Sequence, residues 1–100
     1  MDCILYNLTK RVERNLFTYS HNLETLDIGG QCTYIDCYVC YDSRCQLDLI
    51  VRKVVPPELN GPFFFAQGGS IKSIKVPAEG VDAYKVAPYW SQYADIISAI

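Results

Sequence analysis

The stretches QCTYIDCYVC (31–40) and CQLDLIVRKVV (45–55) decide our expectation of the fold. Both are rich in β-branched and aromatic residues, which favour strands. The residues between them, Tyr41-Asp42-Ser43-Arg44, include short polar side chains that favour a turn. We therefore predict an antiparallel β-hairpin over residues 31–55.

Centring the turn on Asp42-Ser43 gives the hairpin one mostly apolar face, which we expect to point into the core. That face carries Tyr34, Asp36, Tyr38, Cys40, Cys45, Leu47, Leu49 and Val51. The other face is mixed. A slip of one residue would exchange the faces, because side chains alternate along a strand.

Turn signals divide the rest of the chain into short segments. Pro56-Pro57 ends the second strand, since proline has no N–H for a ladder. We predict strands over residues 15–28, 70–76 and 81–87, a turn over 77–80, and either a strand or a helix over 91–100. Residues 3–14 fit a helical stripe and a strand equally well. We find no internal repeat.

These signals predict an all-β fold, or a β-rich fold with one short N-terminal helix. The chain has 100 residues, half of them hydrophobic and a fifth charged, which is typical of one globular domain spanning residues 1–100. Short strands with turns every ~8–12 residues favour a single-domain antiparallel β-sandwich with the hairpin 31–55 at its centre.

The β-rich pattern, the aromatic C-terminus and the missing catalytic set favour a protein partner or self-assembly, with a homo-oligomer left open. The net charge is −2 and no basic face is evident, so we expect no nucleic-acid partner. No apolar run reaches the ~20 residues that cross a bilayer, so we expect no membrane partner. The start MDCILYNLTKRVER has its bases after the apolar stretch, which predicts cytoplasmic synthesis in a host cell rather than secretion by a signal peptide.

A cluster of thiols is the strongest metal-like motif. Cys32, Cys37, Cys40 and Cys45 form C-x4-C-x2-C-x4-C, which formally provides four zinc ligands. The residues between them favour extended backbone, in which Cys37 and Cys40 point to opposite faces. We therefore predict structural thiols and no metal or cofactor, with a metal-binding module as an alternative. Cys40 and Cys45 are the pair placed for a disulfide under oxidation.

No set of residues predicts catalysis. His21 is the only histidine and lies in a polar turn, without an evident nucleophile or oxyanion hole. Neither glycine pair, Gly29-Gly30 or Gly68-Gly69, continues into a phosphate-binding loop. We predict that the protein is not an enzyme.

Aromatic residues are the most informative feature for binding. Tyr89, Trp90 and Tyr93 follow Pro88 near the C-terminus. Tyrosine and tryptophan are the residues that interfaces favour. These three are our interaction candidates, although the interpretation we favour for them is that they close one end of the sandwich.

From Leu26 onward the order of features resembles small β-sandwich domains of bacteriophage virion proteins. The matching stretches are LDIGG, TYIDCYVCYDSRCQLDLIV, VPAEG and PYWSQYADIIS. The resemblance implies a capsid decoration, head–tail or tail-associated role, which would place the protein in the virion. It does not supply any functional residue. Ala94-Asp95 stands where a basic position is expected, and the cysteine content also departs from the family.

Together these observations predict a non-enzymatic structural or interaction protein that docks to a larger protein assembly, such as a phage or viral particle. One alternative is a small inhibitor of a host enzyme or defence complex. Another is the cysteine-cluster metal module.

Overall fold

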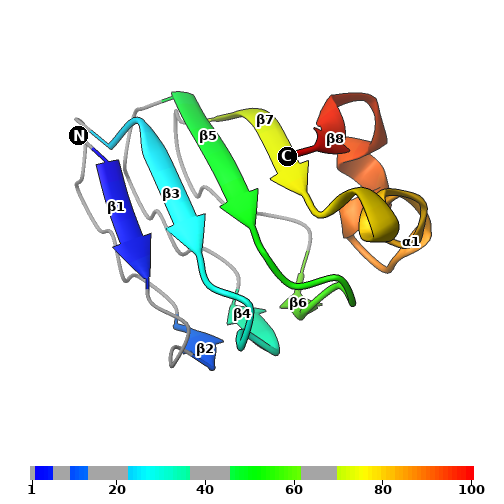
Figure 1. Ribbon diagram of the computed structural model, residues 1–100, viewed down its shortest axis with the longest axis horizontal. Helices are drawn as coiled ribbons and strands as arrows, with labels where there is room; N and C mark the ends of the chain where they lie inside the picture. The colour runs from blue at the N-terminus through cyan, green and yellow to red at the C-terminus, as the bar shows by residue number, and fades with distance from the viewer. Residues whose placement is uncertain (1, 6–9, 14–22, 37–45, 62–69) are drawn as a thin grey trace.

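Two parallel β-sheets and a C-terminal helical segment make up the fold in a computed structural model that describes residues 2–5, 10–13, 23–36, 46–61 and 70–100 (Figure 1). The larger sheet has the order β1 (Asp2–Leu5), β3 (Thr25–Ile28), β5 (Gln46–Val51), β7 (Ser70–Val76) and β8 (Ile97–Ala99). The smaller has the order β2 (Arg11–Val12), β4 (Tyr34–Asp36) and β6 (Glu58–Asn60). The chain visits the two sheets alternately from β1 to β7, so it winds as a solenoid.

The strand registers reveal a repeat that we did not find in the sequence. One buried position recurs along the larger sheet at offsets of 23, 25 and 23 residues, at Leu26, Leu49, Ile74 and Ile97. In the smaller sheet, Arg11, Tyr34 and Glu58 are paired at offsets of 23 and 24 residues. Between β5 and β7 the offset is 24 residues up to Leu47, and an irregularity between Leu47 and Asp48 adds one more. Each turn of the solenoid is therefore one structural repeat that buries its apolar side against its neighbours.

The core lies between the two sheets and is built by alternation along each strand. In β5 the buried positions are Leu47, Leu49 and Val51, which confirms that part of the sequence prediction. In β4 the buried residue is Ile35, whereas Tyr34 and Asp36, which we expected in the core, are half-buried. One core cluster joins both sheets to the C-terminal segment, and its other members are Val12, Leu23, Leu26, Ile28, Cys32, Ile74, Val76, Tyr84, Trp90 and Ile97.

Polar side chains on the outside of the larger sheet connect successive turns of the solenoid. Arg52 donates two hydrogen bonds of 2.8 Å to the carboxylate of Asp27. Ser73 donates to Asp48 at 2.7 Å, and Lys72 lies 3.4 Å from the same carboxylate. These links hold neighbouring strands in register on a face that water reaches.

The C-terminal segment covers the end of the solenoid next to β7 and β8 (Figure 1). It contains a short 3-10 helix, η1 (Ala78–Gly80), the helix α1 (Val81–Val86) and a second 3-10 helix, η2 (Trp90–Ile96). We refer to residues 78–96 as the C-terminal cap. The strand predicted for 81–87 is therefore wrong. Asp82 in the first turn of α1 and Lys85 in the last complement the helix dipole, a helical signal that the strand-like alternation of Tyr84 and Val86 obscures in the sequence.

The antiparallel β-sandwich is also wrong, because every strand pair among the described residues is parallel and the fold is mixed α/β. The hairpin over 31–55 fails for the same reason. Its two arms enter different sheets: β4 pairs with β2 and β6, whereas β5 pairs with β3 and β7. Strand-forming composition identifies extended segments, but the choice of partner depends on distant residues.

Other predictions for single segments have mixed outcomes. The strands over 70–76 and at the end of 15–28 are confirmed as β7 and β3. Residues 3–14 contribute β1 and β2, so the described part of that segment is strand rather than helix. Residues 91–100 contain both alternatives, since η2 ends at Ile96 and β8 follows at once.

Candidate functional site

Of the three interaction candidates, the structure leaves one on the surface. Tyr89 is 45% exposed, whereas Trp90 is buried at 2% and Tyr93 is half-buried against the core cluster. Trp90 is therefore in the first place a structural anchor. Tyr89 has φ 64°, a backbone conformation that is rare outside glycine, and it turns the chain from α1 into η2.

Two buried aromatic side chains attach the C-terminal cap to the loop between β5 and β6. The Trp90 indole N–H donates to the carbonyl oxygen of Pro57 at 2.8 Å, and the Tyr84 hydroxyl donates to the carbonyl oxygen of Lys53 at 2.7 Å. The two rings meet edge to face, with centroids 4.9 Å apart. Burial raises the pKa of Tyr84, so its hydroxyl stays protonated and keeps donating.

Close packing at the start of α1 fixes the same loop. A Cβ on Gly80 would lie 2.4 Å from the backbone oxygen of Val54, so only glycine fits there. The cap and the loop thus meet through backbone contact as well as through the aromatic anchors. The corner that they form has a defined shape before any partner arrives.

A pocket of about 220 Å³ lies at this corner. We call it the corner pocket, and its walls come from the β5–β6 loop, from β6 and from the turn after α1. The lining residues are Pro56, Pro57, Glu58, Leu59, Ala87, Pro88 and Trp90. Only Glu58 among them is ionisable, so the lining offers no pair of groups for acid–base or nucleophilic chemistry.

Exposed apolar side chains flank the corner pocket along the chain. Val55 precedes the lining residue Pro56, Val86 precedes Ala87, and Tyr89 stands between Pro88 and Trp90. Val55 is 65% exposed and Val86 is 80% exposed. With Tyr89 and with Val54, at 42%, they form what we call the apolar rim. Val55, Val86 and Tyr89 are thus exposed apolar residues that directly adjoin lining residues in the chain, which makes this corner the candidate binding site.

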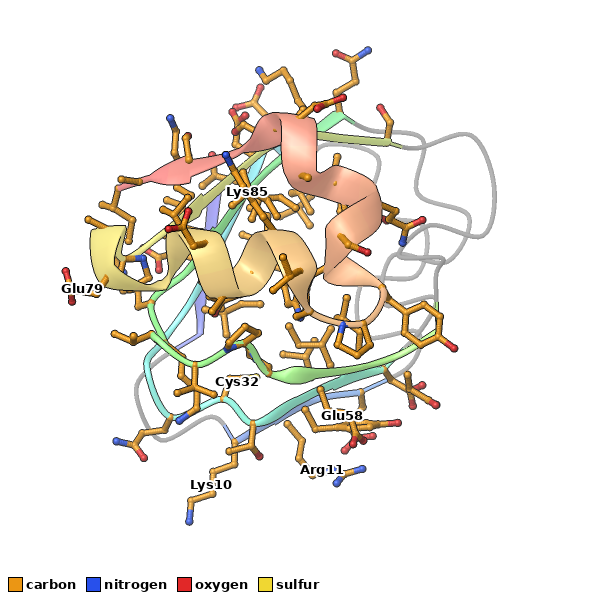
Figure 2. The ribbon with its side chains drawn as sticks, turned by 90° about the vertical axis from the view of Figure 1, so that its right-hand side faces the viewer. Lys10, Arg11, Cys32, Glu58, Glu79 and Lys85 are labelled. Carbon is orange, nitrogen blue, oxygen red and sulfur yellow. The ribbon has the colours of Figure 1, made fainter. Side chains whose placement is uncertain are left out.

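The cysteine cluster can be followed only at its first member. Cys32 is buried inside the solenoid, and its thiol donates to the carbonyl oxygen of Tyr34 at 3.5 Å (Figure 2). Burial raises the pKa of the Cys32 thiol, which opposes formation of a thiolate ligand. Cys37, Cys40 and Cys45, and with them the predicted disulfide pair, lie outside the described residues, as does His21. Within the described ranges, no three potential metal ligands gather.

The outside of the smaller sheet is polar, and several of its side chains are paired with one another. The Arg11 guanidinium lies 4.2 Å from the centroid of the Tyr34 ring and donates to Glu13 at 2.9 Å. The hydrogen bond to Glu13 raises the pKa of Arg11. Asn60 donates to the Asp36 carboxylate at 2.9 Å. These polar groups already satisfy one another, so this surface is a weaker candidate than the corner pocket.

Among the residues that line the corner pocket, sequence reasoning singled out Trp90, and it did not single out the residues over 56–59. The pattern over residues 56–59 indicates only a strand end and the start of a turn. These residues reach Trp90 because the solenoid brings positions about thirty residues apart into contact. The pair of exposed valines before the pair of prolines, at 54–57, is the one local signal that could have indicated a surface site.

No protein-family model matches the chain, and no curated protein matches it significantly. The virion and phage role therefore has no support from known proteins, and the sandwich on which the resemblance was drawn is replaced by a parallel solenoid. We withdraw that role. None of the helices in the described part of the chain is long and apolar enough to cross a bilayer.

Proposed function

We propose that the protein is a non-enzymatic interaction module that holds a protein partner at the corner pocket and the apolar rim. The observation that carries the proposal is the exposure of Val55, Val86 and Tyr89, each next in the chain to a residue that lines an apolar pocket whose walls are fixed by hydrogen bonds. Transfer of these side chains from water into an interface is favourable, and it supplies the driving force for binding.

The rigidity of the corner supports the proposal further. A preformed site avoids the entropic cost of ordering a loop at the moment of binding. Central apolar contacts with a polar surround are the usual anatomy of a protein interface. Solenoids also carry binding surfaces, and here the candidate surface combines residues of one turn with residues of the cap.

The test is affinity capture with three versions of the full chain. Ala87→Leu extends a side chain that lines the corner pocket, and Ala83→Leu makes the same change at an exposed position of α1 away from the lining. We expect the wild type and Ala83→Leu to retain the same partner from a lysate of the native source, and Ala87→Leu to lose it. Capture that is equal for all three proteins would refute the proposal.

Self-assembly is tested by size-exclusion chromatography with light scattering. A concentration-dependent oligomer that Ala87→Leu abolishes and Ala83→Leu preserves would make the partner a second copy of this chain. A monomer at all concentrations, together with no pocket-dependent capture, would refute both versions of the function.

A further inference from the structure

The volume of the corner pocket indicates the size of what enters it. About 220 Å³ is below the 300–1,000 Å³ of typical pockets for cofactors and drug-sized ligands. It is large enough to hold one bulky apolar side chain. The pocket therefore fits one residue of a partner chain rather than a free cofactor.

The walls determine which polar groups a partner can use. Pro56, Pro57 and Pro88 have no N–H to offer. The amides of Glu58 and Ala87 already donate to the carbonyl oxygens of Thr33 and Tyr84. The Trp90 indole N–H is taken by Pro57. The lining therefore offers a partner mainly apolar ring and methyl groups, and the Glu58 carboxylate is its one charged hydrogen-bond acceptor.

Glu58 gives the pocket its charge. It is exposed, and no ion pair or side-chain hydrogen bond joins its carboxylate to another described residue. Arg11 lies two strands away from Glu58 across the smaller sheet, and its guanidinium is engaged by Glu13 and the Tyr34 ring. Figure 2 shows Glu58 and Glu79 on different sides of the molecule, so Glu58 is the acid that belongs to the pocket.

We infer that the partner is a protein segment that inserts a bulky apolar side chain into the corner pocket and pairs a neighbouring lysine or arginine with Glu58. This inference rests on the proposed function and names the chemistry of its partner. The apolar residue supplies most of the affinity, because it is desolvated in the pocket. The basic residue selects among partners and accelerates encounter, because the Glu58 charge lies at the water-exposed edge of the pocket.

The test uses a random twelve-residue peptide library displayed on phage and selected on the wild-type protein. We expect enrichment of peptides with a large apolar residue close to lysine or arginine. Binding of a selected peptide, followed by fluorescence anisotropy, should weaken about twofold to fivefold in Glu58→Gln, as for an exposed ion pair. This difference should shrink in high salt. Glu79→Gln is the matched control and should bind like the wild type.

The outcomes separate the inference from the function on which it rests. Some selected peptides could lose binding to Ala87→Leu and yet carry no basic residue, or bind Glu58→Gln as well as the wild type. Either result would overturn the inference about Glu58 and leave the interaction site at the corner pocket standing. If every selected peptide binds Ala87→Leu as well as the wild type, the inference and the proposed interaction site both fail. Circular dichroism and urea unfolding establish whether each variant is folded. If Ala87→Leu does not fold, Glu58→Gln still tests the inference, because Glu58 is exposed and its replacement should not disturb the fold.

Discussion

Replacing Trp90 by alanine should remove a large part of the stability of the protein, whereas replacing the adjacent Tyr89 should change it little. Trp90 is 2% exposed, donates a 2.8 Å hydrogen bond to Pro57 and packs edge to face on Tyr84. Truncating a buried aromatic side chain typically costs about 3–5 kcal/mol. The hydrogen bond contributes about 1 kcal/mol of this and the ring pair about 1 kcal/mol. Tyr89 is 45% exposed, so its truncation should cost under about 1 kcal/mol.

Urea unfolding followed by far-ultraviolet circular dichroism measures both variants, since Trp90 is the only tryptophan and its fluorescence is lost with it. With a slope of about 2 kcal/mol per molar urea, the midpoint of Trp90→Ala should fall by about 2 M. Trp90→Phe, which keeps a ring but loses the indole N–H, should have a midpoint between those of Trp90→Ala and the wild type. If Trp90→Ala were no less stable than Tyr89→Ala, Trp90 would not anchor the C-terminal cap and the account of the corner would be wrong.

Three further predictions concern the same packing. Gly80→Ala should destabilise the protein by about 1–3 kcal/mol in thermal unfolding, because its new methyl group would clash with the backbone oxygen of Val54. Gly30→Ala is the control and should be close to neutral, because the atom nearest to its new methyl group lies at 3.6 Å. The pKa of Tyr84 is higher in the folded protein than the value of about 10 that it has in the unfolded chain, so its contribution to stability is complete below about pH 10 and is lost as the pH rises towards the folded pKa. Above about pH 10, the unfolding free energy of Tyr84→Phe should therefore decline less steeply than that of the wild type, as measured by urea unfolding. The Cys32 thiol should stay unmodified by a thiol reagent in the native protein and react on unfolding, as read by peptide mass mapping; rapid labelling of native protein would contradict its burial.

Local composition was enough to find several strands and to place part of the core. The alternation of Leu47, Leu49 and Val51 predicts both the strand β5 and its buried face. The same reasoning fails for β4, because Tyr34 and Ile35 are both acceptable core residues and the sequence contains nothing nearby to choose between them. A difference of one residue in that choice exchanged the two faces.

The solenoid itself could have been recognised from a spacing rather than from any single segment. The pairs Leu26/Ile28, Leu49/Val51 and Ile74/Val76 repeat the same apolar-x-apolar pattern at nearly constant intervals. The intervening residues differ in every turn, so the pattern is visible only when the chain is compared with itself. Parallel pairing then follows, because each turn returns to the same sheet in the same direction.

Only the part of the candidate site that lies near the C-terminus could be predicted from the sequence, because it belongs to one local segment. Tyr89 and its neighbours stand out by composition, but burial separates Trp90 from Tyr89 and no spacing rule distinguishes adjacent aromatic residues. The wall formed by Pro56 to Leu59 depends on tertiary packing, and Glu58 has no sequence feature that marks it among the eleven acidic residues.

The stacking of β1 at one edge of the larger sheet and β8 at the other has a mechanical consequence (Figure 1). A force that separates those two edges acts across the strands, so it opens the ladder hydrogen bonds a few at a time instead of shearing them all together. Each turn of 23 residues that peels away would lengthen the chain by about 75–80 Å. Under tension the molecule should therefore extend in discrete steps, and the turn held by the C-terminal cap should be the last to yield.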